Sequence, residues 1–496
     1  MKRRLHETYG SCFQIVSPGG VAIYIADADI ARELVTRNEA FPKPLEELGV
    51  LNVFGINVAT TEGAMWKKHR RITTPPFNER NSALVWEESL SQGGGMISYL
   101  QAQSAKKFNV PPESTTSVKV EDLMVHTMTL ALNVFTYAGF GVSSQFSDAE
   151  SVPKATPGLS KMGPTLTLRT ILENIAIVVA IPPALLRFRF APELWHRCLA
   201  AKEEWFDYAQ SLAQQEQSEK ARGDTLLTNL LRNARDDETQ RGEEKAQGTK
   251  LERTRLSAGL DKNEIAGNIF VFSLAGSETS AVTIATAITQ LAIYPDMQDW
   301  VFDEVQKVYS SRRPEGLEYA TTYPQLNRIR ALIHESLRLY GPTPEIAKST
   351  NNGPQSLMTP RGPLHIPAGV QIHVNNVAMH LDPVYWGNDV ENFRPQRWLS
   401  RDTNGKEVPR PDFPAKGAFM PWAGGARICP GQKFSLVEMC AVIVTVLAGW
   451  RVEIAKLSPN ENSEAAKQRA LKANEDRTFR ITLQPQNSPA LMFVRR

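Results

Sequence analysis

The order of hydrophobic and polar positions predicts a short β-rich start followed by a mostly helical chain. Apolar and polar residues alternate in CFQIVSPGGVAIYIAD, and Pro18, Gly19 and Gly20 interrupt the alternation. The pattern predicts two strands of a small sheet between Gly10 and Ile25, joined by a turn.

Helix start and stop signals organise the next part of the chain. Asp27 or Asp29 can cap a helix that ends near Arg37. Prolines then favour an irregular segment over residues 42–61, and a short helix is predicted over residues 62–71.

A capping box formed by Asp261 and Glu264 opens a long apolar helix, predicted over residues 263–294. A helix of that length and hydrophobicity must run through the middle of the molecule. The later predicted elements are a helix over residues 329–340, strands over residues 364–372, a helix over residues 434–450, and a second small hairpin formed by FRITLQ and ALMFV.

The most apolar stretch, ILENIAIVVAIPPALLRFRF, covers residues 171–190. Pro182 and Pro183 break it, and Glu173 and Arg187 flank it, so it is too short and too broken to span a bilayer. Two interpretations stay open: a core helix followed by an apolar loop, or an interfacial patch that dips into a membrane surface.

Composition favours one large unit. The 496 residues are 42% apolar with no clear linker, which predicts a single domain over residues 1–496. Lys and Arg number 56 against 53 Asp and Glu, and this net charge of +3 gives no argument for a nucleic-acid partner. Residues 214–263 turn to Gln, Glu, Lys, Arg and Gly, which predicts a solvated loop without chemistry.

The four cysteines are scattered, without CxxC or His pairs, so neither a disulfide framework nor a zinc site is suggested. A reducing compartment is expected. The first residues, MKRRLHETYG, carry no apolar h-region, so neither a signal peptide nor a membrane span is expected there.

Cys429 stands in a glycine-rich run, WAGGARICPG, directly before a long apolar helix. Gly424, Gly425 and Gly431 let the backbone approach something large. The N–H groups at the start of the following helix favour an ionised thiolate. A thiolate presented to a flat cofactor fits haem iron, because such a ligand favours O–O cleavage. The alternative is a buried structural cysteine on a turn.

This run resembles the cysteine-ligand signature FxxGxRxCxG of the cytochrome P450 family, with Gly425, Arg427, Cys429 and Gly431 in register. The resemblance implies haem b (iron protoporphyrin IX), with Cys429 as the axial ligand of the iron. Trp422 stands where the family usually has Phe. Its indole N–H could alter the hydrogen bonding of the thiolate, and with it the redox potential of the iron.

A second constellation lies inside the long apolar helix, where AGSETS begins at Ala275. Gly276 and Thr279 weaken the helix there. Thr279 offers a hydroxyl and Glu278 a carboxylate for a proton relay. The run resembles the family's AGxxT oxygen-activation motif, which implies catalytic roles for Ala275, Gly276, Glu278 and Thr279. The alternative is a hydroxyl bonded back to the helix and a surface glutamate.

Glu335 and Arg338 in HESLRLYG stand one helical turn apart, close enough for an ion pair. They resemble the family's ExxR motif, and FRPQRW supplies Arg397 as the arginine from a later loop. The resemblance implies a buried network that holds the cysteine loop in place and does not react.

Trp66 and Arg70 in WKKHRR are spaced i, i+4, so an indole N–H and a guanidinium point the same way. In the family this WxxxR contacts a haem propionate, and the arginine corresponding to Arg427 contributes as well. The other basic residues of this helix are expected to form a surface patch that attracts an acidic electron-transfer protein: Lys67, Lys68 and Arg71.

The segment HLDPVYWG resembles the family's HxDPxxWG stretch, a turn-rich connection assigned to structure. His380, its first residue, has no second ligand at a suitable spacing, which argues against a metal site.

The motifs occur in family order from about Tyr9 to the C-terminus. Together they imply a mostly α (α+β), single cytochrome P450-type fold with a long central helix over the haem and small β-sheets. The implied enzyme is a monomeric monooxygenase. It activates O2 with electrons from NADPH, through NADPH–cytochrome P450 reductase, to hydroxylate, epoxidise or oxidatively couple a lipophilic small molecule. The resemblance is closest to fungal microsomal members, many of which tailor secondary metabolites.

Two other functions stay open. A haem-thiolate isomerase or dehydratase would keep Cys429 but need neither O2 nor a reductase, and a non-catalytic haem sensor would have no use for a proton relay. Microsomal members usually begin with a membrane anchor. The implied location is therefore the cytoplasmic face of the endoplasmic reticulum if an anchor is missing from this sequence, and the cytoplasm otherwise.

Overall fold

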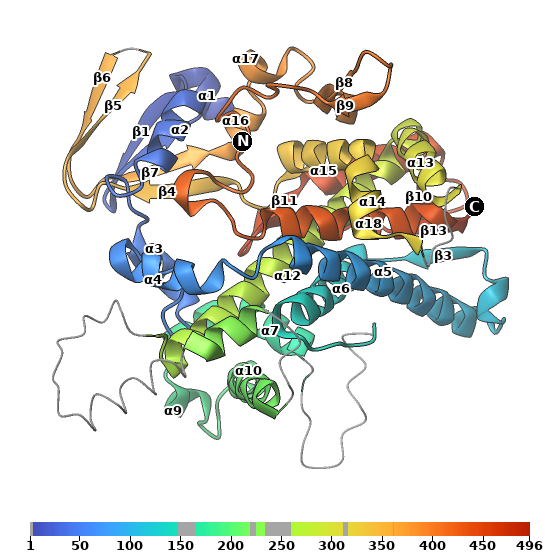
Figure 1. The fold of residues 1–496 in the computed structure, drawn as a ribbon, viewed down its shortest axis with the longest axis horizontal. Helices are drawn as coiled ribbons and strands as arrows, with labels where there is room; N and C mark the ends of the chain where they lie inside the picture. Colours follow the sequence, from blue (N-terminus) through green and yellow to red (C-terminus); the bar gives the residue numbers. More distant parts are fainter. Residues whose placement is uncertain are drawn as a thin grey trace. The chain divides into compact units, whose positions relative to one another are not determined.

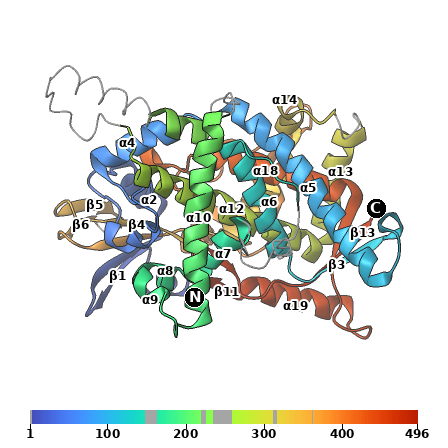
Figure 2. The same cartoon turned by 90° about the horizontal axis from the view of Figure 1, so that it is seen from below.

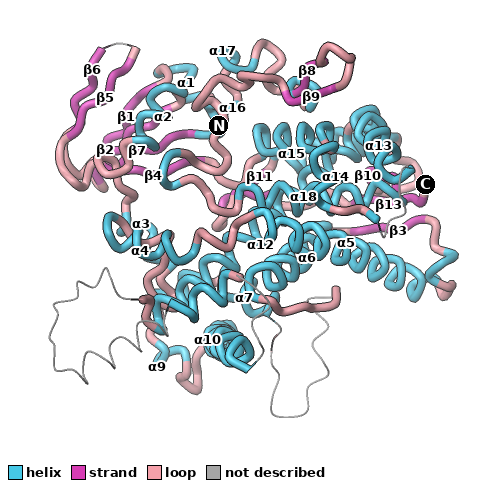
Figure 3. The backbone as a smooth tube through the Cα atoms, viewed as in Figure 1, coloured by secondary structure: helices cyan, strands magenta, loops and turns pink. Residues whose placement is uncertain are grey.

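The computed structural model describes residues 3–146, 162, 164–218, 225–233, 259–310, 316–360 and 362–496 (Figure 1). The chain divides into two compact units. Unit 1 comprises Met1–Pro44, Ser89–Thr127 and Thr279–Arg496, and unit 2 comprises Leu45–Glu88 and Met128–Glu278. Helices are the commonest regular structure in both units, and every strand that is described lies in unit 1 (Figure 3). The expected mostly α fold with small sheets is confirmed, whereas the single domain over residues 1–496 stays a prediction.

The largest sheet of unit 1 has the strand order β1-β2-β7-β4. The predicted hairpin is confirmed, because β1 and β2 pair antiparallel. Strand β7 pairs parallel with β2 and antiparallel with β4. The bounds of these strands are β1 (Cys12–Ser17), β2 (Gly20–Ile25), β4 (Glu345–Ser349) and β7 (Gln371–Asn375).

Helix α2 (Ala28–Thr36) follows this sheet and shares its core. Of the two predicted caps, Asp27 is the one used: its carboxylate accepts from the N–H groups of Asp29 and Ile30 at 3.1 and 3.0 Å. Leu34 of α2 is fully buried in the same cluster as Ile25 of β2.

The smaller sheets confirm one prediction and correct another. Strands are present as predicted over residues 364–372, and they belong to different sheets, because β6 pairs with β5 whereas β7 joins the large sheet. FRITLQ overlaps both strands of the β11–β12 hairpin and the turn between them, whereas ALMFV lies in β13, between β10 and β3. The hairpin predicted between these two segments is therefore wrong. The strands are β3 (Ser117–Val120), β5 (Gln355–Thr359), β6 (Gly362–Ile366), β8 (Leu399–Arg401), β9 (Glu407–Pro409), β10 (Trp450–Ile454), β11 (Arg477–Phe479), β12 (Leu483–Pro485) and β13 (Leu491–Arg495).

Helix α18 (Gln432–Gly449) lies at the core of unit 1, where α13 (Pro295–Ser310) and α15 (Asn327–Tyr340) pack against it (Figure 1). The two helices predicted over residues 329–340 and 434–450 are thereby confirmed. The other helices of this unit are α1 (Arg4–Tyr9), α14 (Tyr319–Thr322), α16 (Asn376–His380), α17 (Pro383–Trp386) and α19 (Ser463–Glu475).

Unit 2 is built around α10 (Glu193–Ser218), against which α7, α8 and α9 pack (Figure 2). The apolar stretch at residues 171–190 is thus divided among three helices. The segment expected to be irregular over residues 42–61 contains two short helices, α3 and η1 (Gly49–Leu51). The bounds of the α-helices are α3 (Leu45–Leu48), α4 (Gly63–Thr73), α7 (Pro164–Glu173), α8 (Ile175–Ala180) and α9 (Pro183–Leu186).

The loop predicted over residues 214–263 is wrong in part. Helix α10 continues to Ser218, and residues 226–233 are helical, with Leu226, Leu227 and Leu230 buried. The polar run QRGEEKAQGTKLERTR lies outside the described residues.

Three long helices contribute residues to both units: α5 (Glu79–Phe108), α6 (Leu123–Phe140) and α12 (Lys262–Ile293). By length and composition alone, α6, α12 and α18 could cross a membrane. However, 78%, 83% and 61% of their apolar windows are buried inside the protein. Their hydrophobicity is therefore used largely in the protein interior.

Candidate haem-thiolate site

The Cys429 loop is closed by its own backbone. The Cys429 N–H donates to the Trp422 carbonyl at 2.9 Å, and α18 begins at Gln432, just after the cysteine. Cys429 is exposed, which rules out the alternative of a buried structural cysteine. An accessible thiol next to a helix N-terminus has the environment that favours a thiolate ligand.

The glycines before the cysteine serve packing inside unit 1. A Cβ on Gly425, whose φ is +63°, would lie 2.1 Å from the Val35 carbonyl oxygen of α2, and a Cβ on Gly424 would lie 3.1 Å from the Val35 side chain. A Cβ on Gly431 would make only an ordinary contact, 3.8 Å from the Cys429 sulfur. Close approach to α2 thus explains Gly424 and Gly425 without a cofactor.

Trp422 does not direct its indole N–H to the Cys429 thiolate, the partner considered from the sequence. Its indole Nε1–H donates to the Ser435 hydroxyl in the first turn of α18 at 3.2 Å. The ring also packs edge-on against His334 and Phe419, with centroids 6.0 and 6.3 Å apart. The indole N–H therefore has an oxygen partner other than the thiolate.

Glu335 lies at the centre of a fully buried network. Arg338 binds its carboxylate through two nitrogens at 2.8 and 2.9 Å, and Arg397 Nε donates at 3.0 Å. Trp398 Nε1 and the Arg394 N–H add bonds of 2.9 Å each. The side chains of Glu335 and Arg338 are 0% exposed. The predicted cluster of one glutamate and two arginines thus exists, and charged donors satisfy the buried carboxylate.

His380 connects this network to the cysteine segment. Its carbonyl accepts from Arg338 Nη1 at 2.9 Å, and its ring Nε2 accepts from the Met420 N–H at 3.2 Å. Burial and the nearby Arg338 charge lower the pKa of His380 to about 3, so the ring is a neutral acceptor. The structural assignment of HLDPVYWG is thereby supported by a specific contact.

The AGSETS run contains the accessible stretch of α12. From Glu264 to Ile293, every residue is buried except Ala275, Gly276 and Thr279. Their i, i+1, i+4 spacing places them on one face of the helix. Glu278 is only 4% exposed, so the alternative of a surface glutamate is wrong.

Gly276 also has a packing reason within unit 2. A Cβ at this position would lie 2.5 Å from the Phe135 ring of α6. Its absence lets the ring rest on the helix backbone.

Helix α4 carries Trp66 and Arg70 in unit 2, with Trp66 buried and Arg70 half-buried. Lys68 departs from the prediction of a basic surface patch. It is buried, and its Nζ lies 3.1 Å from Glu264, because the first turn of α12 packs beside α4. Lys67 and Arg71 are exposed, as expected.

Sequence reasoning missed four polar residues near these motifs: Trp398, Ser435, Lys68 as an interior cation, and Glu438. Trp398 is the last residue of FRPQRW, where a tryptophan N–H next to two arginines was a readable signal. Glu438 of α18 is 0% exposed, and a lone acid in an otherwise apolar helix was its signal. Burial raises its pKa to about 8, partly offset by the Ser280 hydroxyl of α12.

Comparison with known proteins identifies the family. The family model named Cytochrome P450 matches residues 2–478. The chain belongs to the cytochrome P450 family. A cytochrome P450 monooxygenase of Penicillium roqueforti is 30% identical over 491 residues, covering 92% of this chain and 78% of the relative. The phomenoic acid biosynthesis cluster cytochrome P450 monooxygenase of Leptosphaeria maculans is 30% identical over 481 residues, covering 91% and 77%.

Solved structures agree on the fold. The crystal structure of cytochrome P450DA heme domain is similar with a TM-score of 0.71 at 17% identity, covering 99% of this chain and 91% of that chain. A second cytochrome P450 crystal structure has a TM-score of 0.72 at 18% identity, with coverages of 99% and 96%. The expected fold class and monooxygenase class are confirmed, and the protein is an oxidoreductase of the cytochrome P450 type.

The donor set fits the haem that a cytochrome P450 carries. Among the described residues, no group of three or more His, Cys, Asp or Glu side chains could hold a metal ion by itself. In this family haem iron is held by a cysteine thiolate. The exposed Cys429 would be available for that role.

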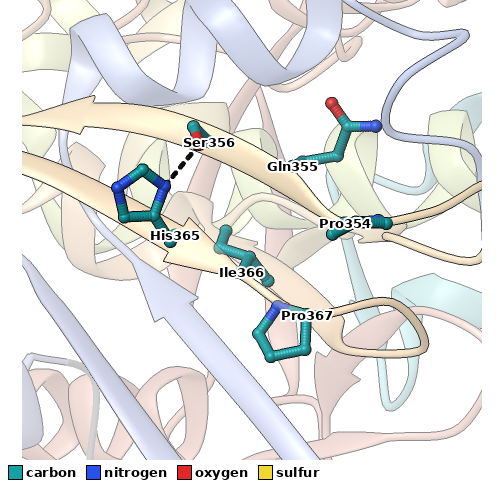
Figure 4. A pocket seen from close by; sticks show the side chains of 6 residues that line it. All are labelled: Pro354, Gln355, Ser356, His365, Ile366 and Pro367. Carbon is teal, nitrogen blue, oxygen red and sulfur yellow. Dashed lines mark hydrogen bonds between the residues drawn. The ribbon is translucent and has the colours of Figure 1, made fainter.

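Two other hollows lie away from the cytochrome P450 motifs. One of about 480 Å³ lies on the β5–β6 hairpin, where the Ser356 hydroxyl is 2.8 Å from His365 Nδ1 (Figure 4). Another, of about 240 Å³, lies between α7 and α10 in unit 2. No residue of the cytochrome P450 motifs lines either hollow.

Proposed function

We propose that this cytochrome P450 is a haem b monooxygenase in which the Cys429 thiolate is the axial ligand of the iron. The observation that carries the proposal is the exposed cysteine in a loop closed by its own N–H, at the start of the buried helix α18. Bound haem would supply the redox chemistry that activates O2. The chain's residues would hold the group, orient the substrate, exclude water and deliver protons.

Glu278 and Thr279 are the proposed proton-handling pair. The carboxyl of Glu278 would hold a proton, and Thr279 Oγ1, on the accessible stretch of α12, would pass it on. Ala275 and Gly276 share that stretch and would leave room for O2. Trp66, Arg70 and Arg427 would donate to the haem propionates, as such donors do in the family. Gly425 and Gly431 would shape the cysteine loop.

Electrons would come from NADPH through NADPH–cytochrome P450 reductase. Exposed Lys67 and Arg71 of α4 support attraction of an acidic electron-transfer protein. The substrate would be a lipophilic small molecule with a C–H or C=C bond to oxidise. The phomenoic acid cluster relative supports a place in secondary metabolism.

Unit 2 offers a surface for peripheral membrane contact. Within residues 171–190, Val179, Leu185, Phe188 and Phe190 are exposed, Phe190 to 81%. Large apolar side chains beside Arg187 and Arg189 suit the interface of an anionic membrane. The exposed side chains favour the interfacial patch over the plain core helix. We propose that the enzyme works as a monomer at the cytoplasmic face of the endoplasmic reticulum.

The test is NADPH consumption with purified reductase in the presence of candidate lipophilic substrates. Consumption that yields an oxygenated product supports a monooxygenase. An isomerase or dehydratase would turn over without NADPH, and a sensor would bind ligand without either. Thr279→Ala is expected to consume NADPH but release more peroxide and less product, and unchanged coupling would remove Thr279 from the mechanism.

A further inference from the structure

The cysteine loop contains a strained residue that is not glycine. Ala423 has a φ of +58°, in the left-handed region that favours glycine over residues with a side chain. Its N–H donates to the Met420 carbonyl at 3.0 Å, so Ala423 closes the tight turn formed by Pro421 and Trp422. A strained turn persists only where its surroundings hold it.

Trp422, which lies inside this turn, is bonded on both sides of the loop. Its carbonyl accepts the N–H of Cys429 at 2.9 Å, and its indole N–H donates to Ser435 Oγ at 3.2 Å. One residue therefore joins the backbone of the thiolate-bearing residue to the helix that follows it.

Ser435 is well placed to anchor that bond. Its N–H donates to the Gly431 carbonyl at 2.8 Å, and its hydroxyl donates to the Gln432 carbonyl at 3.0 Å. Because the hydroxyl proton is directed at Gln432, a lone pair of Oγ remains for the indole of Trp422. The acceptor is thus oriented by the first turn of α18.

The aromatic neighbours of Trp422 fix the plane of its ring. His334 and Phe419 contact it edge-on, and Phe419 in turn packs on Trp398, with ring centroids 4.7 Å apart. Burial and the nearby Arg330 charge lower the pKa of His334 to about 4, so it packs as a neutral ring. Trp398 donates to Glu335, which connects the aromatic cluster to the buried ionic network.

We propose that Trp422 and Ser435 form a positioning pair that holds Cys429 in its ligating geometry against the backbone strain at Ala423. The pair explains why a tryptophan stands where the cytochrome P450 family usually has phenylalanine: its additional N–H has a dedicated acceptor. This inference rests on the proposed function, because it presumes that Cys429 is the iron ligand.

The test is a guanidinium titration of the holoenzyme followed by two signals. The first is the long-wavelength Soret band of the reduced, CO-bound protein, which reports thiolate ligation. The second is far-UV circular dichroism, which reports global unfolding. Ser435→Ala should shift the equilibrium toward the short-wavelength form about fivefold at a given denaturant concentration, the size expected for one lost hydrogen bond. The circular dichroism midpoint should stay unchanged.

Three further variants isolate the pair. In a Trp422→Phe background, Ser435→Ala should have at most half of its single effect, because its main partner is gone. Ser435→Thr keeps the hydroxyl and should behave like the wild type. Ala423→Gly relieves the strain and should restore the band in the Ser435→Ala protein.

Independent, additive effects of Trp422→Phe and Ser435→Ala would overturn the proposal, as would a parallel loss of both signals or a failed rescue by Ala423→Gly. If the wild type itself showed no long-wavelength band, the proposed function would fail instead. The two failures are therefore distinguishable.

Discussion

Lys68 and Glu264 form an ion pair inside unit 2, with Lys68 Nζ 3.1 Å from the carboxylate and side chains only 5% and 6% exposed. His69 Nε2 lies 3.5 Å from the same carboxylate, and the Asn268 amide lies 2.9 Å from His69 Nδ1. Through these contacts, α4 is fixed to the first turns of α12. The pair therefore anchors the helix that carries Trp66 and Arg70.

Breaking this pair should be costly. Lys68→Met leaves the Glu264 carboxylate buried without its cation, and we expect a loss of about 3–5 kcal/mol in the free energy of unfolding. Lys67→Met, on the exposed face of the same helix, is the matched control and should change stability by less than about 0.5 kcal/mol. Guanidinium denaturation of both variants at neutral pH measures the difference, and equal effects would contradict the assignment.

The Glu264 site also predicts that the protein loses stability at low pH. Burial by itself raises the pKa of Glu264, but hydrogen bonds from His69, the Asp261 N–H and Lys68 together lower it to about 2. A folded-state pKa below the unfolded value means that this stability is present above about pH 4.5 and is lost as the pH falls toward 2. Glu264→Gln should therefore flatten the fall in melting temperature over that range, and an unchanged acid profile would count against the network.

Glu438 predicts the opposite pH dependence. Its pKa is raised to about 8 by burial in α18, so the folded protein keeps a proton that the unfolded chain releases above about pH 4.5. Stability should fall with rising pH from about 4.5 to about 8, by about 1.4 kcal/mol per pH unit. Glu438→Gln, a neutral isostere, should remove that slope. Denaturant midpoints at pH 6 and pH 8 for the wild type and for Glu438→Gln measure this slope. Parallel profiles for the two proteins would show that Glu438 is ionised throughout.

Contacts between residues that are close in the sequence could be predicted, whereas contacts between distant residues could not be predicted from local patterns. The capping box of Asp261 and Glu264 was readable because both bonds, each 2.8 Å, lie within one helical turn. The Lys68–Glu264 pair joins residues 196 positions apart, so only the tertiary fold brings them together. Glu335 and Arg397 are also distant, and their pairing was foreseen only through the resemblance to a family.

Other parts of the site depended on backbone details that a sequence does not display. The acceptor of the Trp422 indole is set by a turn in which Ala423 is left-handed. Gly425 is required because α2 packs closely against it, and α2 lies outside the cysteine motif. The neighbours of strand β13 likewise depend on the tertiary fold. The local pattern of residues therefore predicted the strand but not the strands with which it pairs.

The Glu335 network gives a matched pair of arginine substitutions. Arg397→Ala removes a buried guanidinium that donates to Glu335 and to the Trp386 and Asp389 carbonyls, and should cost about 3–5 kcal/mol. Arg394→Ala keeps the backbone N–H that binds Glu335 and removes only a guanidinium that is 54% exposed, so it should cost less than about 1 kcal/mol. Haem retention and denaturant midpoints measure both. A mild Arg397→Ala would mean that the network does not hold the site.

Alanine substitutions at two glycines of the cysteine loop should have very different effects on haem content. Gly425→Ala places a Cβ 2.1 Å from the Val35 carbonyl at a φ of +63°, so α2 or the loop must move and haem incorporation should be lost. Gly431→Ala makes an ordinary contact and should retain most of the haem. Haem content per chain after purification distinguishes them, and equal retention would refute the packing explanation.

The central claim is that Cys429 is the iron ligand. The most direct measurement is the absorption spectrum of the reduced, CO-bound protein for the wild type and for Cys429→Ser, compared with Cys12→Ser as a control on a different, partly buried cysteine. We predict a long-wavelength Soret band typical of thiolate ligation in the wild type and in Cys12→Ser, and its complete loss in Cys429→Ser. Persistence of that band in Cys429→Ser would contradict the account.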